Sequence, residues 1–436
     1  MILKHIFRSP EHGLALLCIF LLLHASVHAQ TAMEISGKVA DAENGSPLLF
    51  AQIALSNSNT GTVTNDDGMF ALTIPSNHLR DTLVISYLGY ESRRVPVKYF
   101  TTNTGPVMLK PREVQLKEVE VLALTPEEVL RRAFMRIPEN YGGDSVLLTA
   151  FYRSQKFAGK KLAEYTEAVI EDLKAGYFHQ NTMKEIQEAY SKSDFTHLVK
   201  GRVVSDTALV NSMGDVGKMA GCLGCIFMKD MVEFSYHTIL DEETFRFYSL
   251  KMEELGRPEG GRIYHIWFDL SKKNQKGYKG ELFIDGTSFA VMKIKRSISY
   301  MAFDKYEKEK YRKTYTINNI PGWIAEMPLI DETLNYSQKE NGWCLSSIRD
   351  EEWIMFTLPS TGQKVRMGYK NDLVITDASR DTLRTRSFRG DKKAGVNQRW
   401  DQLVGQADEA FWANYNFLPV EEKLKKEIGG IGSCEK

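Results

Sequence analysis

The chain has 436 residues, with 56 basic and 56 acidic side chains and a formal net charge of zero. A balanced charge provides no global attraction for nucleic acid or for an anionic membrane surface, which disfavours both as general partners. Hydrophobic residues make up 43% of the chain, which is enough to fill more than one core at this length, so two domains are expected.

Residues 1–29 have the pattern of a secretory signal peptide. A positively charged start is followed by an apolar segment at 13–23 and by small residues that end at Ala29. This order is typical of export signals, and the apolar segment is shorter than the roughly 20 residues that a membrane-spanning helix needs. We therefore expect residues 1–29 to be removed on export.

Residues 31–111 are predicted to form an antiparallel β-sandwich. Short segments rich in Val, Ile, Leu and Phe alternate with turn residues, which is typical of this fold. Glycine after Asn or Asp supplies the left-handed conformation that tight turns need, and proline cannot donate to a strand ladder. The residues assigned to structural turns on this basis are Gly45, Pro47, Asp67, Gly68 and Gly89.

The motifs of this segment resemble the carboxypeptidase D regulatory-like domain, a transthyretin-like sandwich of seven strands. The resemblance covers 34 to about 110 and rests on G-x-V-x-D-x-x-x-G-x-P-L from Gly37, G-x-x-T-x-x-x-G-x-F-x-L-x-I-P from Gly61, and S-x-L-G-Y from Ser86. In known proteins this domain is an accessory module of peptidases and stands at the front of envelope proteins, including TonB-dependent receptors. Within the linker strand at 112–124, the run Leu116-Lys-Glu-Val-Glu-Val121 resembles the strand that follows the domain in such receptors. The resemblance implies a location in the periplasm or at the outer-membrane periphery of a Gram-negative cell.

Metallopeptidase chemistry is not expected, despite the name of this family. A zinc carboxypeptidase needs a His-x-x-Glu pair, and no histidine beyond residue 29 has Glu three positions later. The acidic segment 65–68 resembles part of a calcium loop, but it lacks the bidentate Glu of an EF-hand, and turn chemistry explains it. We therefore predict no metal, no cofactor and no catalytic residue.

The second domain, residues 125–436, is predicted to combine helices with an antiparallel sheet. Thr125, Pro126 and Glu128 form a helix start with a capping box, and the helix is expected to end at Pro138. Alternating segments favour a meander of hairpins in a large curved sheet. Its predicted strands are 263–270, 280–286, 289–296, 311–318, 323–327, 331–337, 343–349, 353–358 and 364–376. Two further helices are expected near the C-terminus, which disfavours a receptor's barrel.

Two resemblances concern this second domain. The pattern Tyr-x-Gly-x-Leu-x-Ile-Asp at 278–285 weakly resembles the half-barrel sheets of the lipoprotein-carrier superfamily, over about 263–376. More broadly, residues 125–436 resemble an uncharacterised region that follows the regulatory-like domain in Gram-negative envelope proteins. That resemblance is carried by Tyr152-Arg153, Glu164 to Glu167 and the segment from Phe411-Trp412 to Asn416.

Cys222 and Cys225 form the most reactive-looking motif, a C-x-x-C that can exchange disulfides at a helix start. The pair lacks the βαβ setting of a thioredoxin domain, so a structural disulfide or partly buried thiols are the expected alternatives in an oxidising envelope. No second C-x-x-C or His pair is present, which disfavours zinc.

Charged segments allow further interpretations. The basic hairpin at 272–313 could meet anionic lipid or polysaccharide, although a solvated sheet face is the commoner explanation. The carboxylates Glu164 and Glu167, or those at 241–243, could serve as paired glycosidase acids, but acidic surface runs are far commoner. No Gly-x-Ser-x-Gly elbow, P-loop or Gly-x-Gly-x-x-Gly loop occurs.

These observations predict a non-catalytic exported protein that binds or scaffolds at the periplasmic face of the outer membrane. The expected partner is another envelope protein, with an outer-membrane receptor as one candidate and lipid or glycan left open. Nucleic acid is not expected. One alternative is a periplasmic carrier of a lipid or hydrophobic peptide, and another is an accessory component of a TonB-dependent uptake system.

Overall fold

The structure is a computed structural model, and parts of the chain lie outside its described residues. It describes residues 33–56, 58, 60–103, 105–112, 124–174, 176–177, 196–214, 226–235, 238–256, 261–271, 277–299, 323–325, 329–339, 342–389, 404, 408–413, 415 and 418–432. The signal peptide, most of the linker strand, the strand predicted at 311–318, and Cys222 and Cys225 lie outside these residues. Those assignments stay predictions.

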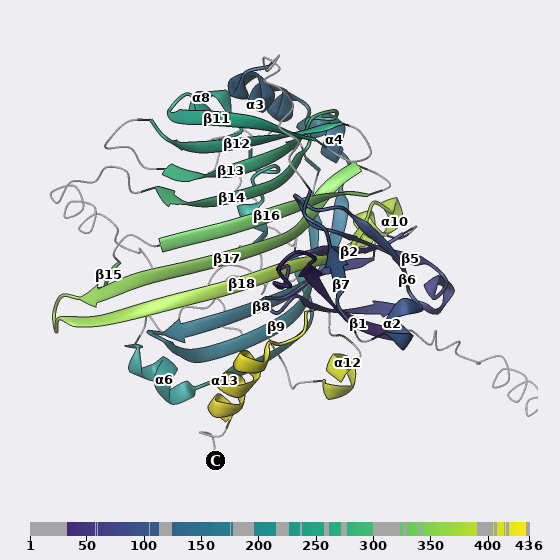
Figure 1. Cartoon of the computed structure of the whole chain (residues 1–436). Helices are drawn as coiled ribbons and strands as arrows, with labels where there is room; N and C mark the ends of the chain where they lie inside the picture. Colours follow the sequence, from purple (N-terminus) through teal and green to yellow (C-terminus); the bar gives the residue numbers. More distant parts are fainter. Residues whose placement is uncertain are drawn as a thin grey trace, which may run out of the picture.

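The N-terminal module is a sandwich of two small sheets (Figure 1). Its elements are β1 (Met33–Asp41), β2 (Gln52–Leu55), β3 (Gly61–Val63), β4 (Met69–Ile74), η1 (Ser76–His78), β5 (Thr82–Ser86), β6 (Arg93–Pro96), α2 (Tyr99–Thr102) and β7 (Val107–Leu109). One sheet has the order β4-β1-β7 and the other β3-β2-β5-β6. The predicted seven-stranded sandwich is confirmed, with one difference. Strand β7 returns beside β1 in the same direction, so this pair is parallel.

The interior of the module follows the predicted alternation. Ile53 and Leu55 of β2 are buried, as are Phe70, Leu72 and Ile74 of β4. Successive side chains of a strand point to opposite faces, so these residues share the inner surface of the sandwich. The two small sheets therefore enclose one core.

The second domain is built on one large antiparallel sheet. Its strands are β8 (Val146–Ala158), β9 (Lys161–Lys174), β10 (Thr196–Ser205), β11 (Tyr248–Gly256), β12 (Arg262–Leu270), β13 (Gly277–Asp285), β14 (Val291–Ser299), β15 (Ile324–Ala325), β16 (Leu329–Lys339), β17 (Gly342–Leu358) and β18 (Gln363–Ser379). The order is β10-β9-β8-β18-β17-β16-β14-β13-β12-β11, and β15 pairs with β17. The predicted meander is confirmed with one addition. The domain's first strand, β8, pairs with its last, β18, although more than 200 residues separate them in the sequence.

One predicted strand boundary in this domain is wrong, and one helix is followed by a second that was not predicted. The segments 343–349 and 353–358 belong to one strand, β17, because the charged residues between them pair with β16 and β18 instead of forming a turn. The helix that begins at Pro126 ends at Met135, before Pro138 as expected, but Pro138 does not begin a loop. It occupies the first turn of a second short helix, where its missing N–H costs nothing.

Helices and irregular segments cover both faces of the large sheet. They are α3 (Pro126–Met135), α4 (Ile137–Tyr141), α6 (Thr207–Ser212), η2 (Phe227–Lys229), α8 (Glu242–Phe245), α10 (Thr382–Ser387), α12 (Glu409–Ala413) and α13 (Glu422–Gly432). The predicted cap is present at α3, where the Thr125 hydroxyl accepts from the Glu128 N–H at 3.2 Å. Among the described residues, we find no helix with the length and apolar character that crossing a bilayer requires.

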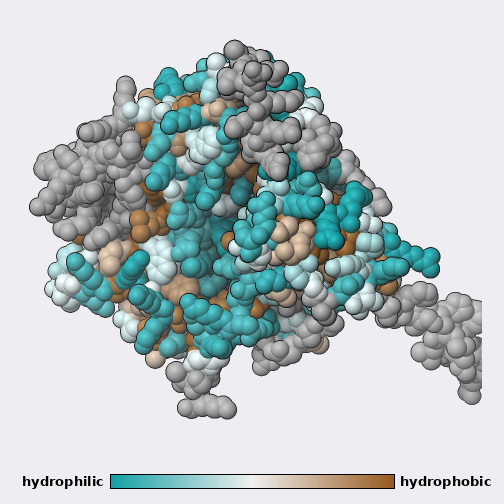
Figure 2. All heavy atoms as spheres, viewed as in Figure 1, coloured by the Kyte–Doolittle hydropathy of each residue, from teal (hydrophilic) through white to brown (hydrophobic). Residues whose placement is uncertain are grey.

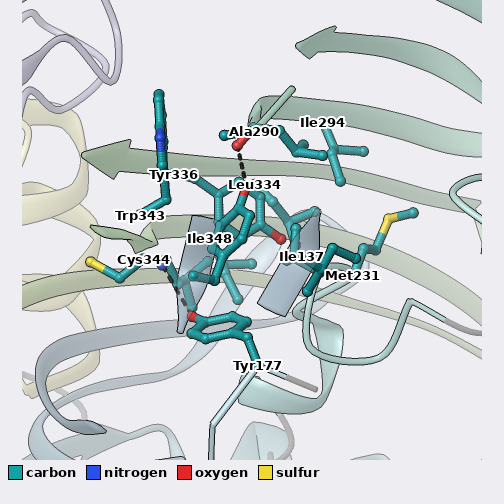
Figure 3. Packing of buried hydrophobic residues seen from close by; sticks show 14 of the residues in the cluster. Ile137, Tyr177, Met231, Ala290, Ile294, Leu334, Tyr336, Trp343, Cys344 and Ile348 are labelled. Atoms are coloured by element: carbon teal, nitrogen blue, oxygen red, sulfur yellow. Dashed lines mark hydrogen bonds between the residues drawn. The ribbon is translucent and has the colours of Figure 1, made fainter. Parts of the chain in front are cut away.

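One face of the sheet carries the main core of the second domain. Helices α3 and α4 and the segment around Met231 pack there, and Figure 3 shows Ile137, Tyr177 and Tyr336 among the packed side chains. The opposite face carries the N-terminal module. Phe151, Val169 and Val374 of the sheet join the module's own core. The two domains therefore share a hydrophobic core.

Candidate functional site

The turn at 65–68 attaches the module to the large sheet. The Asn65 side-chain oxygen accepts the N–H groups of Asp67 at 3.1 Å and Met69 at 2.9 Å, and Gly68 completes the turn with φ of +73°. This leaves Asp66 free to point outward, where its carboxylate accepts from Arg349 of β17 at 2.6 Å. A segment interpreted from sequence as turn chemistry thus also carries an interdomain ion pair.

The C-terminal segment completes this junction. The Asn65 amide donates to the Pro419 carbonyl at 2.9 Å. Arg153 of β8 is 0% exposed and donates to the Leu418 carbonyl and, at 3.0 Å, to Glu167 of β9. A buried guanidinium is stable only when its donors are satisfied, and here β9 and the C-terminal segment supply the acceptors.

Glu167 is the centre of this charge cluster. It accepts from Arg153 and from Arg202, and from the Tyr165 hydroxyl at 2.5 Å. Burial alone would raise the pKa of Glu167, but Arg153 and Arg202 outweigh burial and lower it. The Arg202 guanidinium also lies 4.6 Å from the centre of the Trp412 ring. The resemblance residues Arg153, Glu167 and Trp412 therefore meet in one structural cluster.

A second charge cluster lies under the opposite face of the sheet. Lys174 of β9 is buried and pairs with Asp230 at 3.1 Å and with Glu233. Tyr336 donates to Asp230 at 2.8 Å. Burial, only partly offset by Lys174, raises the pKa of Glu233 to about 7. Glu233 and Asp230 share one cation, Lys174, so this cluster has more acidic than basic side chains.

A third cluster joins the central strands on the same face. Lys229 of η2 bridges Glu332 at 2.7 Å and Asp350 at 2.8 Å, and Arg296 also pairs with Glu332. Although burial acts to raise it, Arg296 and Lys229 lower the pKa of Glu332 to about 2. These opposite charges satisfy one another, which is the arrangement of a structural network.

A pocket lies at the seam between the module and the large sheet. Its volume is about 210 Å³, and it is lined by Phe50, Gln52, Ser86, Tyr87, Leu88, Gly89, Tyr90, Ser92, Arg112, Ile263, Met292, Lys293, Asn335 and Tyr336. The S-x-L-G-Y motif of the module supplies five of these residues in a row. The surface beside the module is hollowed and largely hydrophilic (Figure 2).

The pocket has an unusual charge distribution. Its two charged lining residues, Arg112 and Lys293, are both basic. The Lys293 ammonium lies 5.8 Å from the centre of the Tyr87 ring and 6.0 Å from that of Phe283. Desolvation by these surroundings lowers the pKa of Lys293. In contrast to the three clusters, Lys293 forms no ion pair with any described residue.

The structure separates the residues singled out from the sequence. Gly89 lines the seam pocket with φ of +86°, whereas Gly45, Asp67 and Gly68 lie at other turns of the module and Pro47 forms a β-bridge with Ala40. The carboxylates considered as a catalytic pair diverge, because Glu164 pairs with Lys156 and Glu167 with Arg153. Asp241 caps the start of α8. Within the described ranges, no group of His, Cys, Asp and Glu has the geometry of a metal site.

The pocket residues of the large sheet were missed in the sequence. Lys293 of β14 and Asn335 of β16 become neighbours only when these two strands pair. They reach the pocket only when the module docks on the sheet. The one local signal was the S-x-L-G-Y motif, which marks the module's side of the pocket but carries no information about the opposite wall. Pocket formation depends on docking, which a single sequence does not reveal.

Comparison with known proteins identifies the N-terminal module. Residues 35–121 match the family model of the CarboxypepD_reg-like domain. Over 111 residues the chain is 32% identical to TonB-dependent receptor P39 of Formosa agariphila, a match that covers 25% of this chain and 10% of the receptor. The chain therefore spans about a tenth of the length of that relative.

Solved structures show a weak similarity to lipoprotein-carrier folds. A putative outer membrane lipoprotein-sorting protein domain from Vibrio parahaemolyticus is 12% identical with a TM-score of 0.22, covering 58% of this chain and 92% of that chain. A LolA superfamily protein from Nitrosomonas europaea is 10% identical with a TM-score of 0.19, covering 58% and 95%. Scores this low carry no weight for function.

Proposed function

We propose that this chain is a non-catalytic binding or scaffolding protein of the cell envelope, acting at the periplasmic face of the outer membrane. The match of residues 35–121 to a regulatory-like domain, and not to a peptidase catalytic domain, supports an accessory role. The receptor match supports an envelope setting, because the aligned relative is a TonB-dependent receptor. One specific version of this role is that of an accessory component of a TonB-dependent uptake system.

The observation that carries the proposal is the fixed docking of the module on the large sheet. The shared core, the Asp66–Arg349 ion pair and the Asn65–Pro419 hydrogen bond join the two domains into one body. A composite surface of this kind has a defined shape, and ligand sites occur preferentially where domains meet. The seam pocket is therefore the place where we expect a partner to bind.

Site-specific photocrosslinking in the native cell tests this proposal. A photoreactive residue at Ser92, which is exposed at the pocket, is compared with one at Lys98, which is exposed on the same module outside the pocket. We expect one main adduct with an envelope protein from position 92 and none from position 98. Identical adducts from both positions, or fractionation of the protein with the cytosol, would contradict the proposal.

The carrier alternative receives no comparable support. The seam pocket, at about 210 Å³, is smaller than the roughly 300 Å³ or more that typical small-molecule sites provide. The large sheet carries packed side chains on both faces. A carrier would need a larger apolar cavity.

A further inference from the structure

Resting on the proposed function, we infer that the seam pocket binds a carboxylate of a partner protein, presented by its C-terminus or by an acidic side chain. Lys293 would neutralise this carboxylate, and the Ser86 and Ser92 hydroxyls of the pocket would orient it.

The charge of the pocket selects an anion. Both charged lining residues are basic, and the other polar side chains of the lining are uncharged, among them Gln52, Ser86, Ser92 and Asn335. Lys293 is half-buried, as is Lys229, but Lys229 is paired with Glu332 and Asp350. A concave site with an unpaired ammonium and neutral hydrogen-bonding groups complements a carboxylate, which forms a strong charge-assisted hydrogen bond with Lys293.

The acidic residue nearest to Lys293 in the sheet is already occupied. Glu281 on the neighbouring strand accepts from His265 at 2.9 Å, and His265 also contacts Glu253 at 3.2 Å. The His265 ring stacks on Phe283 at 4.0 Å between centres. Glu281 is thus held toward His265, while the ammonium of Lys293 lies between the Phe283 and Tyr87 rings.

The backbone next to the pocket is held in an uncommon conformation. Phe50, a lining residue, has φ of +58°, and its ring lies 4.2 Å from the Arg349 guanidinium that pairs with Asp66. A bulky residue in the left-handed region costs free energy, and such residues cluster at ligand sites. The same junction that fixes the module therefore also fixes one wall of the pocket.

The size of the pocket favours one chemical group of a larger partner. A volume of about 210 Å³ accommodates a chain end or a single side chain, but it is small for a free cofactor. Capture of a terminal or side-chain carboxylate is a recurring way to recognise a protein segment. The rest of the partner would then contact the surface around the pocket.

The test measures binding of short defined peptides to the purified mature chain by titration calorimetry or NMR. One pair is acetyl-triglycine with a free carboxylate and its amide, which reports on a C-terminal carboxylate. The other pair is acetyl-Gly-Glu-Gly-amide and acetyl-Gly-Gln-Gly-amide, which reports on an acidic side chain. We expect at least one carboxylate peptide to bind roughly ten-fold more tightly than its neutral counterpart, as one charge-assisted hydrogen bond provides.

Two variants and a matched control assign the binding to the pocket. Lys293→Gln should remove the preference for carboxylate, whereas Lys295→Gln, an exposed position two residues along the same strand, should retain it. Ser92→Glu should also abolish binding, because it places a negative charge at the pocket while leaving the packed side chains intact. Equal binding of charged and neutral peptides, no binding, or retention by Lys293→Gln would overturn the inference. So would glucuronate or phosphate binding more tightly than either peptide.

Failure of this inference is distinguishable from failure of the proposed function. Peptide affinity is measured on the purified chain, independently of its location or its partner in the cell. An envelope partner that crosslinks at Ser92, with peptides that do not distinguish charge, would leave the scaffolding role standing and remove the carboxylate site.

Discussion

Arg153 and Lys293 are both basic side chains of the large sheet that lie where another layer packs against it, yet their surroundings differ. Arg153 is 0% exposed and has Glu167 at 3.0 Å, Glu421 at 3.7 Å and main-chain carbonyls as partners. Lys293 has aromatic rings beside it and no ion pair within the described chain. Since burying a charge without a partner costs free energy, the difference assigns Arg153 to the fold and Lys293 to a ligand. Changes at buried structural groups should therefore cost stability, whereas a change at Lys293 should cost ligand affinity.

The largest effect is expected from removing the cation of the second buried cluster. Lys174→Met leaves Asp230 and Glu233 buried without their counter-charge, which should lower the free energy of unfolding by about 3–5 kcal/mol. The control is Lys200→Met, which breaks the exposed pair with Asp408 and should cost less than about 1 kcal/mol. Urea denaturation measures both, and equal costs would mean that the buried cluster is not structural.

A smaller effect is expected at the turn that docks the module. Gly68 and Gly45 share φ of +73°, but a Cβ at Gly68 would lie 2.5 Å from the Val39 carbonyl oxygen, whereas Gly45 has open space. Gly45→Ala should cost about 1 kcal/mol for the left-handed backbone alone, and Gly68→Ala about 1–3 kcal/mol more because of the clash. Thermal and urea unfolding of the two variants give the difference, which should vanish if the turn relaxes freely.

A stabilising change is expected at Asp172. Its carboxylate is buried, one oxygen accepts from Thr196 at 2.7 Å, and the other has no hydrogen-bond partner. Burial raises the pKa of Asp172 to about 6, above the value of about 3.9 in an unfolded chain. Between about pH 4 and pH 6, Asp172 therefore binds more protons in the folded state than in the unfolded state. The contribution of Asp172 to the free energy of unfolding falls as the pH rises through this range.

Asp172→Asn removes this titration and keeps an acceptor for Thr196. Relative to the wild type, the variant should gain about 2 kcal/mol in free energy of unfolding near pH 7, and most of that gain should disappear near pH 4. Urea denaturation across this range measures the difference. A gain that does not depend on pH would show that the carboxylate is not the cause.

The sequence predicted the repetitive parts of the fold better than the parts made by docking. The module and the hairpins of β12 to β14 were predicted because turns such as Asp285-Gly286 and alternating residues are local signals. Strands β8 to β11 were missed. In β8 both faces are buried and charges such as Arg153 lie inside, so the alternation that marks a half-buried strand is absent.

The candidate site was predictable only in part. The S-x-L-G-Y motif was singled out for the family resemblance and Gly89 as a turn residue, not as parts of a binding site, and Lys293 was one of many basic residues in a segment interpreted as a solvated face. Its position in the pocket depends on the pairing of β14 with β16 and on the docking of the module. Neither the strand pairing nor the docking can be inferred from the local pattern of a single sequence.

The most direct test of the account measures stability and ligand affinity together in one variant, Lys293→Gln. An unpaired cation reserved for a ligand should be dispensable for folding. We predict a free energy of unfolding within about 0.5 kcal/mol of the wild type and a loss of carboxylate-peptide affinity of roughly ten-fold or more. A variant that loses several kcal/mol of stability, or that keeps the wild-type preference for carboxylate, would contradict the division between structural charges and the seam pocket.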